Sequence, residues 1–240
     1  MHHLLEVAGL KKSFGSIIVA DDLGLAIVPG EAVGIIGPNG AGKTTLFNLI
    51  AGGISASAGS IRFDGRDLSG VPPQARCRAG IGRTHQIPQP FEKLTVFENL
   101  LVGAVYGGRK AEHEATQSCG EILERLGLLK RANTLAGSLT LLERKRLEMA
   151  RVLATEPKLL LLDEIAGGLT EGECAELVAT IREIRESGVA ILWIEHVVHA
   201  LLAVIDRLIV LNFGRKIAEG SPNEVMQRPD VHQIYIGIEA

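Results

Sequence analysis

The sequence predicts an α/β protein in which helices flank a parallel sheet, and two observations predict it. From residue 159 to residue 211, short apolar runs alternate with helical segments, which is the pattern of strand–helix–strand units. Near the start, the apolar run 32–36 leads through a glycine-rich turn into a helix that begins near Lys43. Strands buried on both faces of a sheet are continuously apolar, so these runs are expected at its centre.

The opening segment is expected to form an N-terminal antiparallel β subdomain. Its apolar runs, 4–8, 17–20 and 24–28, are short and broken by Gly, Asp and Pro, which favour turns. Trp193 falls in an expected strand and is expected in the core, and a helical tail containing Tyr235 is expected at the end. For the parallel sheet we predict strands 32–36, 159–162, 190–194 and 208–211, with helices 171–186 and 197–204.

The middle of the chain is expected to form a helical insertion. From about residue 96 to residue 155 no strand-like run interrupts the helical pattern, which covers 96–105, 111–126 and 141–153. The Pro-rich stretch 87–91 precedes it, and Pro157 would stop a helix at the residue before it. We predict a single domain over residues 1–240, with a core and β subdomain from 1–86 and 156–240 and a helical subdomain from 87–155.

Composition excludes several other classes of protein. The chain has 240 residues, 46% of them hydrophobic and 22% charged, with a formal net charge of -3. This balance gives no strong field for nucleic acid, so no nucleic-acid partner is expected. The longest apolar runs are far shorter than the roughly 20 residues of a membrane-spanning helix. The opening residues lack the features of a secretion signal, and the three scattered cysteines are expected to be free thiols.

The strongest motif is the segment GPNGAGKTT, which lies between an expected strand and an expected helix. Its glycines let the backbone fold around an anion, and successive N–H groups with the helix N-terminus supply partial positive charge. Lys43 adds a full charge for the β and γ phosphates, and the Thr44 hydroxyl suits Mg²⁺. The predicted phosphate-binding residues are Gly37, Pro38, Asn39, Gly40, Ala41, Gly42, Lys43, Thr44 and Thr45.

A buried strand of four leucines ends in two carboxylates, Asp163 and Glu164. Ligands of open α/β sheets bind at the carboxyl ends of the strands, so these side chains are expected to face the phosphate loop. Asp163 fits a metal ligand, and Glu164 fits a general base that polarises the attacking water. A solvated acidic pair that caps the next loop is the alternative.

These motifs resemble those of the ABC transporter ATPase family. The resemblance runs from about Leu4 to Gly237, and the motifs follow the order that they have in that family. The resemblance implies a P-loop NTPase core of the RecA-like type, with ATP and Mg²⁺ as cofactors. Phe14 matches the family's adenine-stacking aromatic, although a core Phe is the alternative. Gln86 matches a glutamine that contacts Mg²⁺ and joins the core to the helical insertion, and His196 matches a histidine that reaches the γ-phosphate.

The resemblance assigns roles to the candidate residues as follows. Catalysis is expected from Lys43, Gln86, Glu164 and His196, and metal binding from Thr44, Gln86 and Asp163. The loop at 168–170 resembles the one that couples the two ATPase subunits of these transporters.

The chain departs from the family signature Leu-Ser-Gly-Gly-Gln, because the matching stretch reads Leu139-Thr140-Leu141-Leu142-Glu143. Thr140 keeps a hydroxyl that can cap a helix and serve the nucleotide site. Leu142 and Glu143 are expected to bring bulk and negative charge towards the ATP of the partner subunit. We therefore expect a non-identical second ATPase subunit as partner, with a homodimer as the alternative. The basic run 144–146 is expected to be a solvated helix face.

Several stretches resemble the subfamily that energises uptake of branched-chain and other hydrophobic amino acids, and related urea or amide importers. They are FGSIIVADDL, GIGRTHQIPQPFEKLTVFENL, RKRLEMARVLATEPKLLLLDE, the AGGL loop and EGSPNEVMQRPDVHQIYIG. The resemblance implies transmembrane permease subunits as partners and a peripheral position on the cytoplasmic face of the inner membrane. The alternatives are the ATPase of a lipid or lipopolysaccharide exporter and a soluble ABC ATPase without a transport role.

Overall fold

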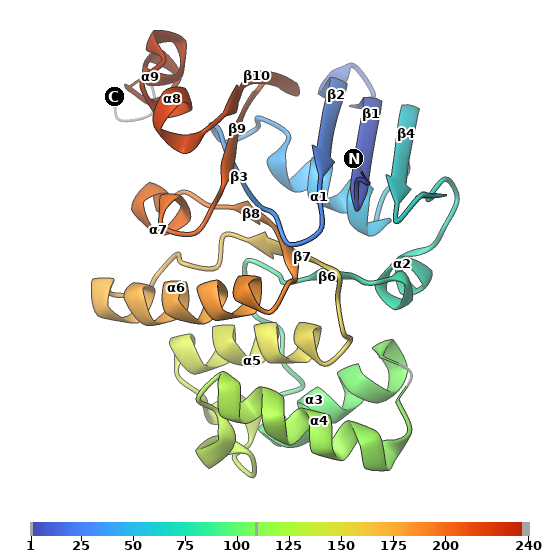
Figure 1. The fold of residues 1–240 in the computed structure, drawn as a ribbon, viewed down its shortest axis with the longest axis vertical. Coiled ribbons are helices and arrows are strands. Elements are labelled where there is room, and N and C mark those ends of the chain that lie inside the picture. The colour runs from blue at the N-terminus through green and yellow to red at the C-terminus, as the bar shows by residue number, and fades with distance from the viewer. Residues whose placement is uncertain (1, 109, 237–240) are drawn as a thin grey trace.

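The computed structural model describes residues 2–108 and 110–236, and Gly237, the end of the stretch that carries the resemblance, lies outside them. The fold is shown in Figure 1. Its strands are β1 (Leu5–Phe14), β2 (Ile17–Ile27), β3 (Ala32–Ile36), β4 (Ala58–Phe63), β5 (Arg66–Asp67), β6 (Ile81–Arg83), β7 (Leu159–Asp163), β8 (Ala190–Ile194), β9 (Arg207–Asn212) and β10 (Arg215–Gly220). Its α-helices are α1 (Lys43–Ala51), α2 (Pro73–Ala79), α3 (Val96–Val102), α4 (Glu112–Arg125), α5 (Leu141–Leu153), α6 (Glu171–Glu186), α7 (Val198–Leu202), α8 (Pro222–Met226) and α9 (Pro229–Ile236).

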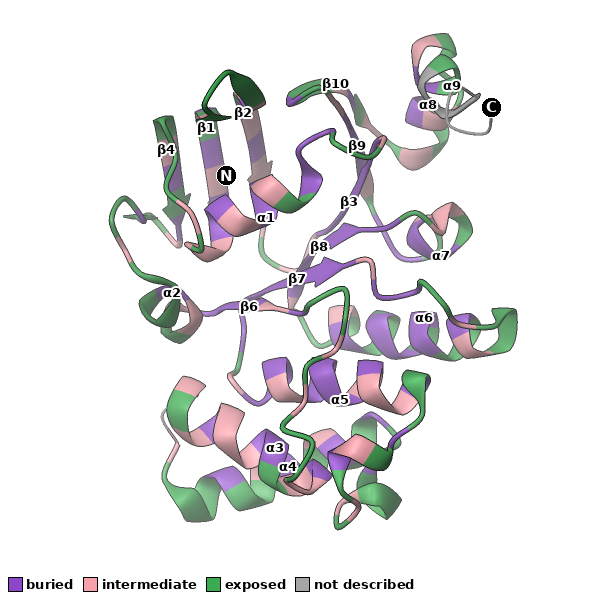
Figure 2. Cartoon of the chain, turned by 180° about the vertical axis from the view of Figure 1, so that it is seen from behind, coloured by how far each residue is buried: buried purple, intermediate pink, exposed green. Residues whose placement is uncertain are grey.

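The larger sheet has the strand order β10-β9-β3-β8-β7-β6. All of these strands are parallel except β10, which pairs antiparallel with β9. Figure 2 shows β3, β7 and β8 buried along their whole length, as their apolar sequences predict. The carboxyl ends of the parallel strands meet at one edge, so the segments that follow β3, β6, β7 and β8 come together there.

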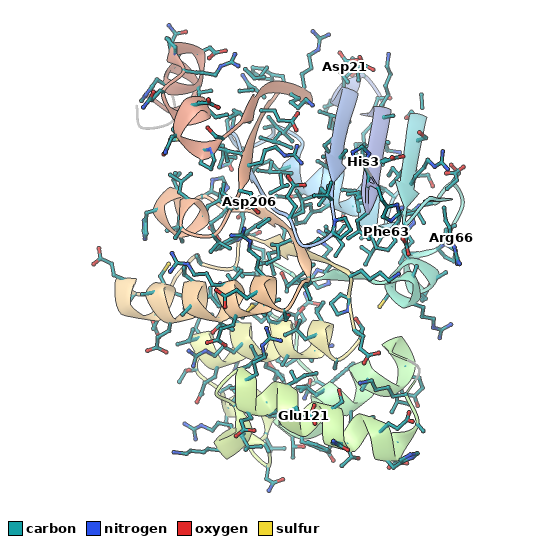
Figure 3. All side chains as sticks on the ribbon, viewed as in Figure 1. His3, Asp21, Phe63, Arg66, Glu121 and Asp206 are labelled. Atoms are coloured by element: carbon teal, nitrogen blue, oxygen red, sulfur yellow. The ribbon has the colours of Figure 1, made fainter. Side chains whose placement is uncertain are left out.

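Asp206 lies at the opposite side of the sheet, where the parallel strands begin, and Figure 3 labels it just before β9. Its carboxylate accepts a hydrogen bond from the Ala32 amide at 3.0 Å and forms an ion pair with Arg185 of α6. This contact fixes the start of β3, and therefore the direction in which β3 leads into the phosphate loop.

The smaller sheet, β2-β1-β4-β5, is antiparallel and confirms the expected β subdomain. The expectation of three short strands before residue 32 is wrong, because runs 17–20 and 24–28 form the single strand β2. Register shifts interrupt the pairing of β1 with β2, and Asp22 has a φ of 59°. Bulges of this kind let a strand continue through polar residues. Sequence reasoning did not find β4, β5, β6, β10 or α2, whose apolar runs are very short.

The middle of the chain contains α3, α4 and α5, which lie together on one side of the larger sheet in Figure 1. Helix α3 ends at Val102 and is followed directly by a π-helical turn, Gly103–Gly107. A Cβ atom added at Gly103 would lie 2.7 Å from the carbonyl oxygen of Arg151, so α3 and α5 approach closely through this glycine. The division into a core and a helical subdomain at residues 87 and 155 stays a prediction.

The expectation of a solvated basic face on α5 is wrong. Lys145 is only 4% exposed, and Arg146 forms an ion pair with Glu176. The physical reason is that α5 packs against α3, α4 and α6, so little of its surface faces solvent. Trp193 is fully buried and the three cysteines are free thiols, as expected. Within residues 2–108 and 110–236, every helix is too short or too polar to cross a bilayer.

Candidate nucleotide and catalytic site

The phosphate loop joins β3 to α1 at the carboxyl edge of the larger sheet. Gly42 precedes the first turn of α1 in the left-handed conformation, with φ 96°, and no side chain caps that turn. A Cβ atom at Gly42 would lie 2.3 Å from the Val19 carbonyl oxygen, and one at Gly37 would lie 2.1 Å from the Leu211 carbonyl oxygen. Only glycine fits at these two positions, and the amides at the start of α1 are left for an anion.

Lys43 folds back onto this loop. Its ammonium donates hydrogen bonds to the carbonyl oxygens of Gly37, at 2.7 Å, and Pro38, at 3.0 Å. The residue is buried, and burial lowers the pKa of the ammonium, while the charges of Glu164 and Asp163 oppose that change. The cation therefore lies between the phosphate loop and the two carboxylates at the end of β7.

Glu164 occupies the centre of the site. It follows β7 with φ 49°, a conformation uncommon outside glycine, and its amide donates to the Ile194 carbonyl at 2.8 Å. Gln86 Nε2 donates to Glu164 Oε2 at 2.6 Å, and His196 Nε2 lies 2.9 Å from Glu164 Oε1. The structure thus brings together three predicted residues that follow three neighbouring strands, β6, β7 and β8.

Asp163 has a partner that sequence reasoning missed. Its side chain is buried and accepts a hydrogen bond from Arg83 Nη2 at 2.9 Å, while Arg83 Nη1 donates to the Asn48 side chain at 2.6 Å. Arg83 ends β6, so its charged side chain at the carboxyl end of an apolar strand is the signal that could have identified it. The pair compensates the cost of burying the Asp163 carboxylate.

Phe14 lies at the end of β1 and is 51% exposed. Its exposure excludes the alternative of a core phenylalanine. The Lys12 ammonium lies 4.9 Å from the centroid of its ring, within the range of a cation–π contact. A half-exposed aromatic face of this kind is available for stacking with a flat ligand.

The signature segment forms the start of α5. Thr140 caps the helix, as expected: its hydroxyl accepts from the Glu143 amide, and the Glu143 carboxylate accepts from the Thr140 amide. Arg131 also pairs with Glu143 at 2.8 Å. Hydrogen bonding by the Thr140 amide, helped by Arg131 and opposed by burial, holds the pKa of Glu143 below its ordinary value. The negative charge expected at Glu143 is therefore present, and the helix cap and Arg131 are its partners.

The expected bulk at Leu142 is wrong, because Leu142 is 8% exposed and belongs to the apolar core. The exposed bulk is Leu141, which is 43% exposed. Its side chain lies close to the loop after β7, since a Cβ atom at Gly168 would be 3.3 Å from Leu141 Cδ2. The first lost glycine, rather than the second, therefore changes the surface of the signature segment.

The predicted metal ligands supply an alcohol, an amide and a carboxylate oxygen, which are the hard donors that Mg²⁺ prefers. Thr44 is exposed at the start of α1, and Gln86 uses its amide nitrogen on Glu164, so its amide oxygen is left for another contact. The donor set fits Mg²⁺ in chemistry. Among the residues that the structure describes, no group of three His, Cys, Asp or Glu side chains offers an alternative metal site.

Comparison with known proteins gives the same picture. The ABC transporter family matches residues 20–167 of the chain. The high-affinity branched-chain amino acid transport ATP-binding protein LivG of Escherichia coli strain K12 is 39% identical over 98% of both chains. The lipopolysaccharide export ATP-binding protein LptB of Escherichia coli strain K12 is 34% identical over 97% of both.

The fold agrees as closely. A solved ATP-binding cassette of an ABC transporter in its ADP conformation matches with a TM-score of 0.91 and 34% identity, over 99% of this chain and 100% of that one. Together with the phosphate loop and the acidic end of β7, these matches identify the chain. It belongs to the ABC transporter family, as an ATP-hydrolysing subunit.

Proposed function

We propose that this subunit drives the import of branched-chain or other hydrophobic amino acids from the cytoplasmic face of the inner membrane. The ATPase role rests on one observation: Glu164 is held between Gln86 and His196 at the edge of the sheet that carries the phosphate loop. The cargo rests on the similarity to LivG over nearly the whole chain. The cargo itself would be chosen by the permease subunits.

In the proposed site, ATP binds along the phosphate loop with its adenine against Phe14. Lys43 exchanges the carbonyl oxygens of Gly37 and Pro38 for phosphate oxygens, which are stronger acceptors because they are charged. Glu164 accepts a proton from the attacking water, and His196 orients the γ-phosphate. Thr44, Gln86 and Asp163 would hold Mg²⁺, which neutralises the charge that develops on the phosphates.

The permease is expected to dock in a groove beside the Gln86 loop. The groove lies between β6 and the middle helices and is lined by Gly82, His85, Phe91, Gly103, Arg151 and Thr155, among others. Phe91 is exposed, and the Arg151 guanidinium lies 4.9 Å from its ring centroid. Aromatic residues and arginine are both enriched at protein–protein interfaces. Gln86 lies in the chain between His85 and Phe91, which both line this groove. Because Gln86 also donates a hydrogen bond to Glu164, the loop links the docking surface to the proposed general base.

The second ATPase subunit is proposed to differ from this one. In this family the signature segment of one subunit acts on the ATP of the other, and the exposed Leu141 stands where a glycine is usual. A partner with glycine at that position would complete the site on this chain. The site on the partner would be weaker.

The proposal is tested by reconstituting the chain with its permease in lipid vesicles and measuring ATP hydrolysis with and without leucine, isoleucine or valine. Stimulation by these amino acids supports the proposed cargo. The similarity to LptB makes lipopolysaccharide export the second candidate. Stimulation by lipopolysaccharide and not by amino acids would replace the proposed cargo with that one.

A further inference from the structure

Glu195 follows β8, next to His196, and no step proposed so far uses it. It is a carboxylate only 1% exposed at the edge of the sheet where the nucleotide is expected. We propose that Glu195 is a positioning residue that fixes the loop 165–169 and His196 relative to Glu164. The inference rests on the proposed ATPase site and goes beyond it, because the hydrogen bonds of the Glu195 side chain are to backbone amides.

The Glu195 carboxylate is hydrogen-bonded to the backbone of two loops. Glu195 Oε2 accepts from the Ala166 amide at 2.9 Å, and Oε1 accepts from the His196 amide at 2.9 Å and the Val197 amide at 3.3 Å. One side chain therefore holds the backbone of two loops from two strands. A carboxylate is costly to bury, and three N–H donors compensate that cost only while both loops keep this arrangement.

These hydrogen bonds lie next to Glu164 on both sides. The Glu164 amide donates to the carbonyl of Ile194, and the Glu164 carboxylate contacts His196, so Glu164 interacts with both chain neighbours of Glu195. Glu195 in turn accepts a hydrogen bond from the amide of Ala166, two residues after Glu164. The result is a closed ring of contacts between residues 164–166 and 194–197. A ring of this kind restricts the carboxylate of Glu164 to one place, and small displacements of a reacting group reduce rates strongly.

The charge of Glu195 also acts on groups from two neighbouring helices. Lys145 of α5, the helix that begins at the signature segment, is buried near Glu195. Burial lowers the pKa of the Lys145 ammonium, and the negative charge of Glu195 opposes that change. The Cys174 thiol of α6 also faces Glu195, and its pKa is raised first by burial and then by that charge. The carboxylate thus lies where the signature helix, α6 and the two loops meet.

The isosteric variant Glu195→Gln separates the two loops. A glutamine has one acceptor oxygen, which is expected to stay with the two amide donors of His196 and Val197. Its NH₂ group then faces the Ala166 amide, donor against donor. We expect faster hydrogen–deuterium exchange in the peptide covering 165–169, with unchanged exchange in the peptide covering 196–198. We expect kcat for ATP to fall about tenfold, the size of one lost charge-assisted hydrogen bond, with KM and ATP affinity unchanged.

Two further variants complete the experiment. Glu195→Asp keeps the charge that faces Lys145 but shortens the reach, so the same local exchange and the same fall in kcat are expected with the fold retained. Glu31→Gln is the matched control, because Glu31 also accepts a backbone amide, from Val28 at 3.0 Å, at the opposite edge of the sheet. It is expected to leave exchange at 165–169 and kcat unchanged.

Each outcome decides the inference. Wild-type kcat in both Glu195 variants would overturn it, and so would faster exchange spread evenly over the chain, which indicates a purely structural role. A rise in KM with constant kcat would also overturn it. If the wild-type transporter hydrolyses no ATP, the proposed function fails instead, and the exchange at 165–169 still tests the tie between Glu195 and that loop.

Discussion

His196 Nε2 lies 2.9 Å from Glu164 Oε1, although 32 residues separate them in the sequence. Parallel strands β7 and β8 are neighbours, so a residue after one lies beside a residue after the other. The contact joins the proposed general base to the proposed γ-phosphate ligand.

The Glu164→Gln variant is expected to bind MgATP like the wild type and to hydrolyse it 100-fold to 10,000-fold more slowly, the usual range for loss of a general base. The amide cannot accept a proton from water, but it keeps the size of the carboxylate. Calorimetry measures the affinity and phosphate release measures the turnover. Wild-type turnover would remove Glu164 from the role of base.

The Lys43→Ala variant is expected to weaken MgATP binding by about 2 kcal/mol, or roughly 30-fold, because one charge-assisted hydrogen bond to phosphate is lost. The carbonyl groups of Gly37 and Pro38 also lose their donor. Titration calorimetry gives the dissociation constant. Exposed Lys93→Ala is the control, and equal affinity in both variants would contradict the proposed phosphate contact.

The Arg83→Met variant is expected to lower the free energy of unfolding by about 3 kcal/mol, because Asp163 is left as an unpaired buried charge. If Asp163 faces Mg²⁺, saturating MgATP should restore more stability to the variant than it adds to the wild type. Chemical denaturation with and without MgATP measures both. Equal gains in the two proteins would argue against metal binding at Asp163.

The capping box of α5 predicts a dependence on pH. The pKa of Glu143 is lowered in the fold, so its contribution is complete above the ordinary value of about 4.5 and is lost as pH falls through the lower, folded value. Glu143→Gln should therefore cost about 1 kcal/mol at pH 7 and progressively less as the pH falls below 4.5. Urea denaturation over a series of pH values checks this, and a cost independent of pH would contradict it.

The signature segment allows a test of the proposed unequal dimer. Leu141→Gly is expected to raise ATP hydrolysis by the chain alone, because it removes exposed bulk at a position where the family has glycine. Leu142→Ala is expected to leave hydrolysis low and to cost about 3 kcal/mol of stability, because it opens a cavity in the core. High, cooperative hydrolysis by the unchanged chain would contradict the proposal of a non-identical partner.

The sequence was most informative where chemistry restricts the choice of residue. Gly42 and Lys43 were found because a phosphate loop needs a residue without a side chain followed by a cation, and Glu164 because it comes directly after an apolar strand that ends in Asp163. The core strands were predicted from their continuous apolar runs, and helix α5 from its helical pattern. The comparisons confirm the family and the fold that these residues predicted.

The rest depended on tertiary contacts that no local pattern encodes. Leu142 and Lys145 belong to a segment that looks half polar, but α5 is covered on several sides, so both are buried. No local pattern marks Glu195, because one of its hydrogen-bond donors, the Ala166 amide, comes from the loop after β7. Arg83 was missed because its partner, Asp163, lies 80 residues away.

The close approach of Gly103, the residue after α3, to the backbone of Arg151 in α5 has a consequence for motion within the subunit. Helices packed this closely cannot slide along each other without separating first, so α3 and α5 should move as one rigid body. Arg151 and Gly103 both line the groove beside Gln86. A tilt of α5 that starts at its signature end would therefore move the groove by a similar amount. The Gly103→Ala variant should uncouple hydrolysis from transport while leaving hydrolysis itself intact.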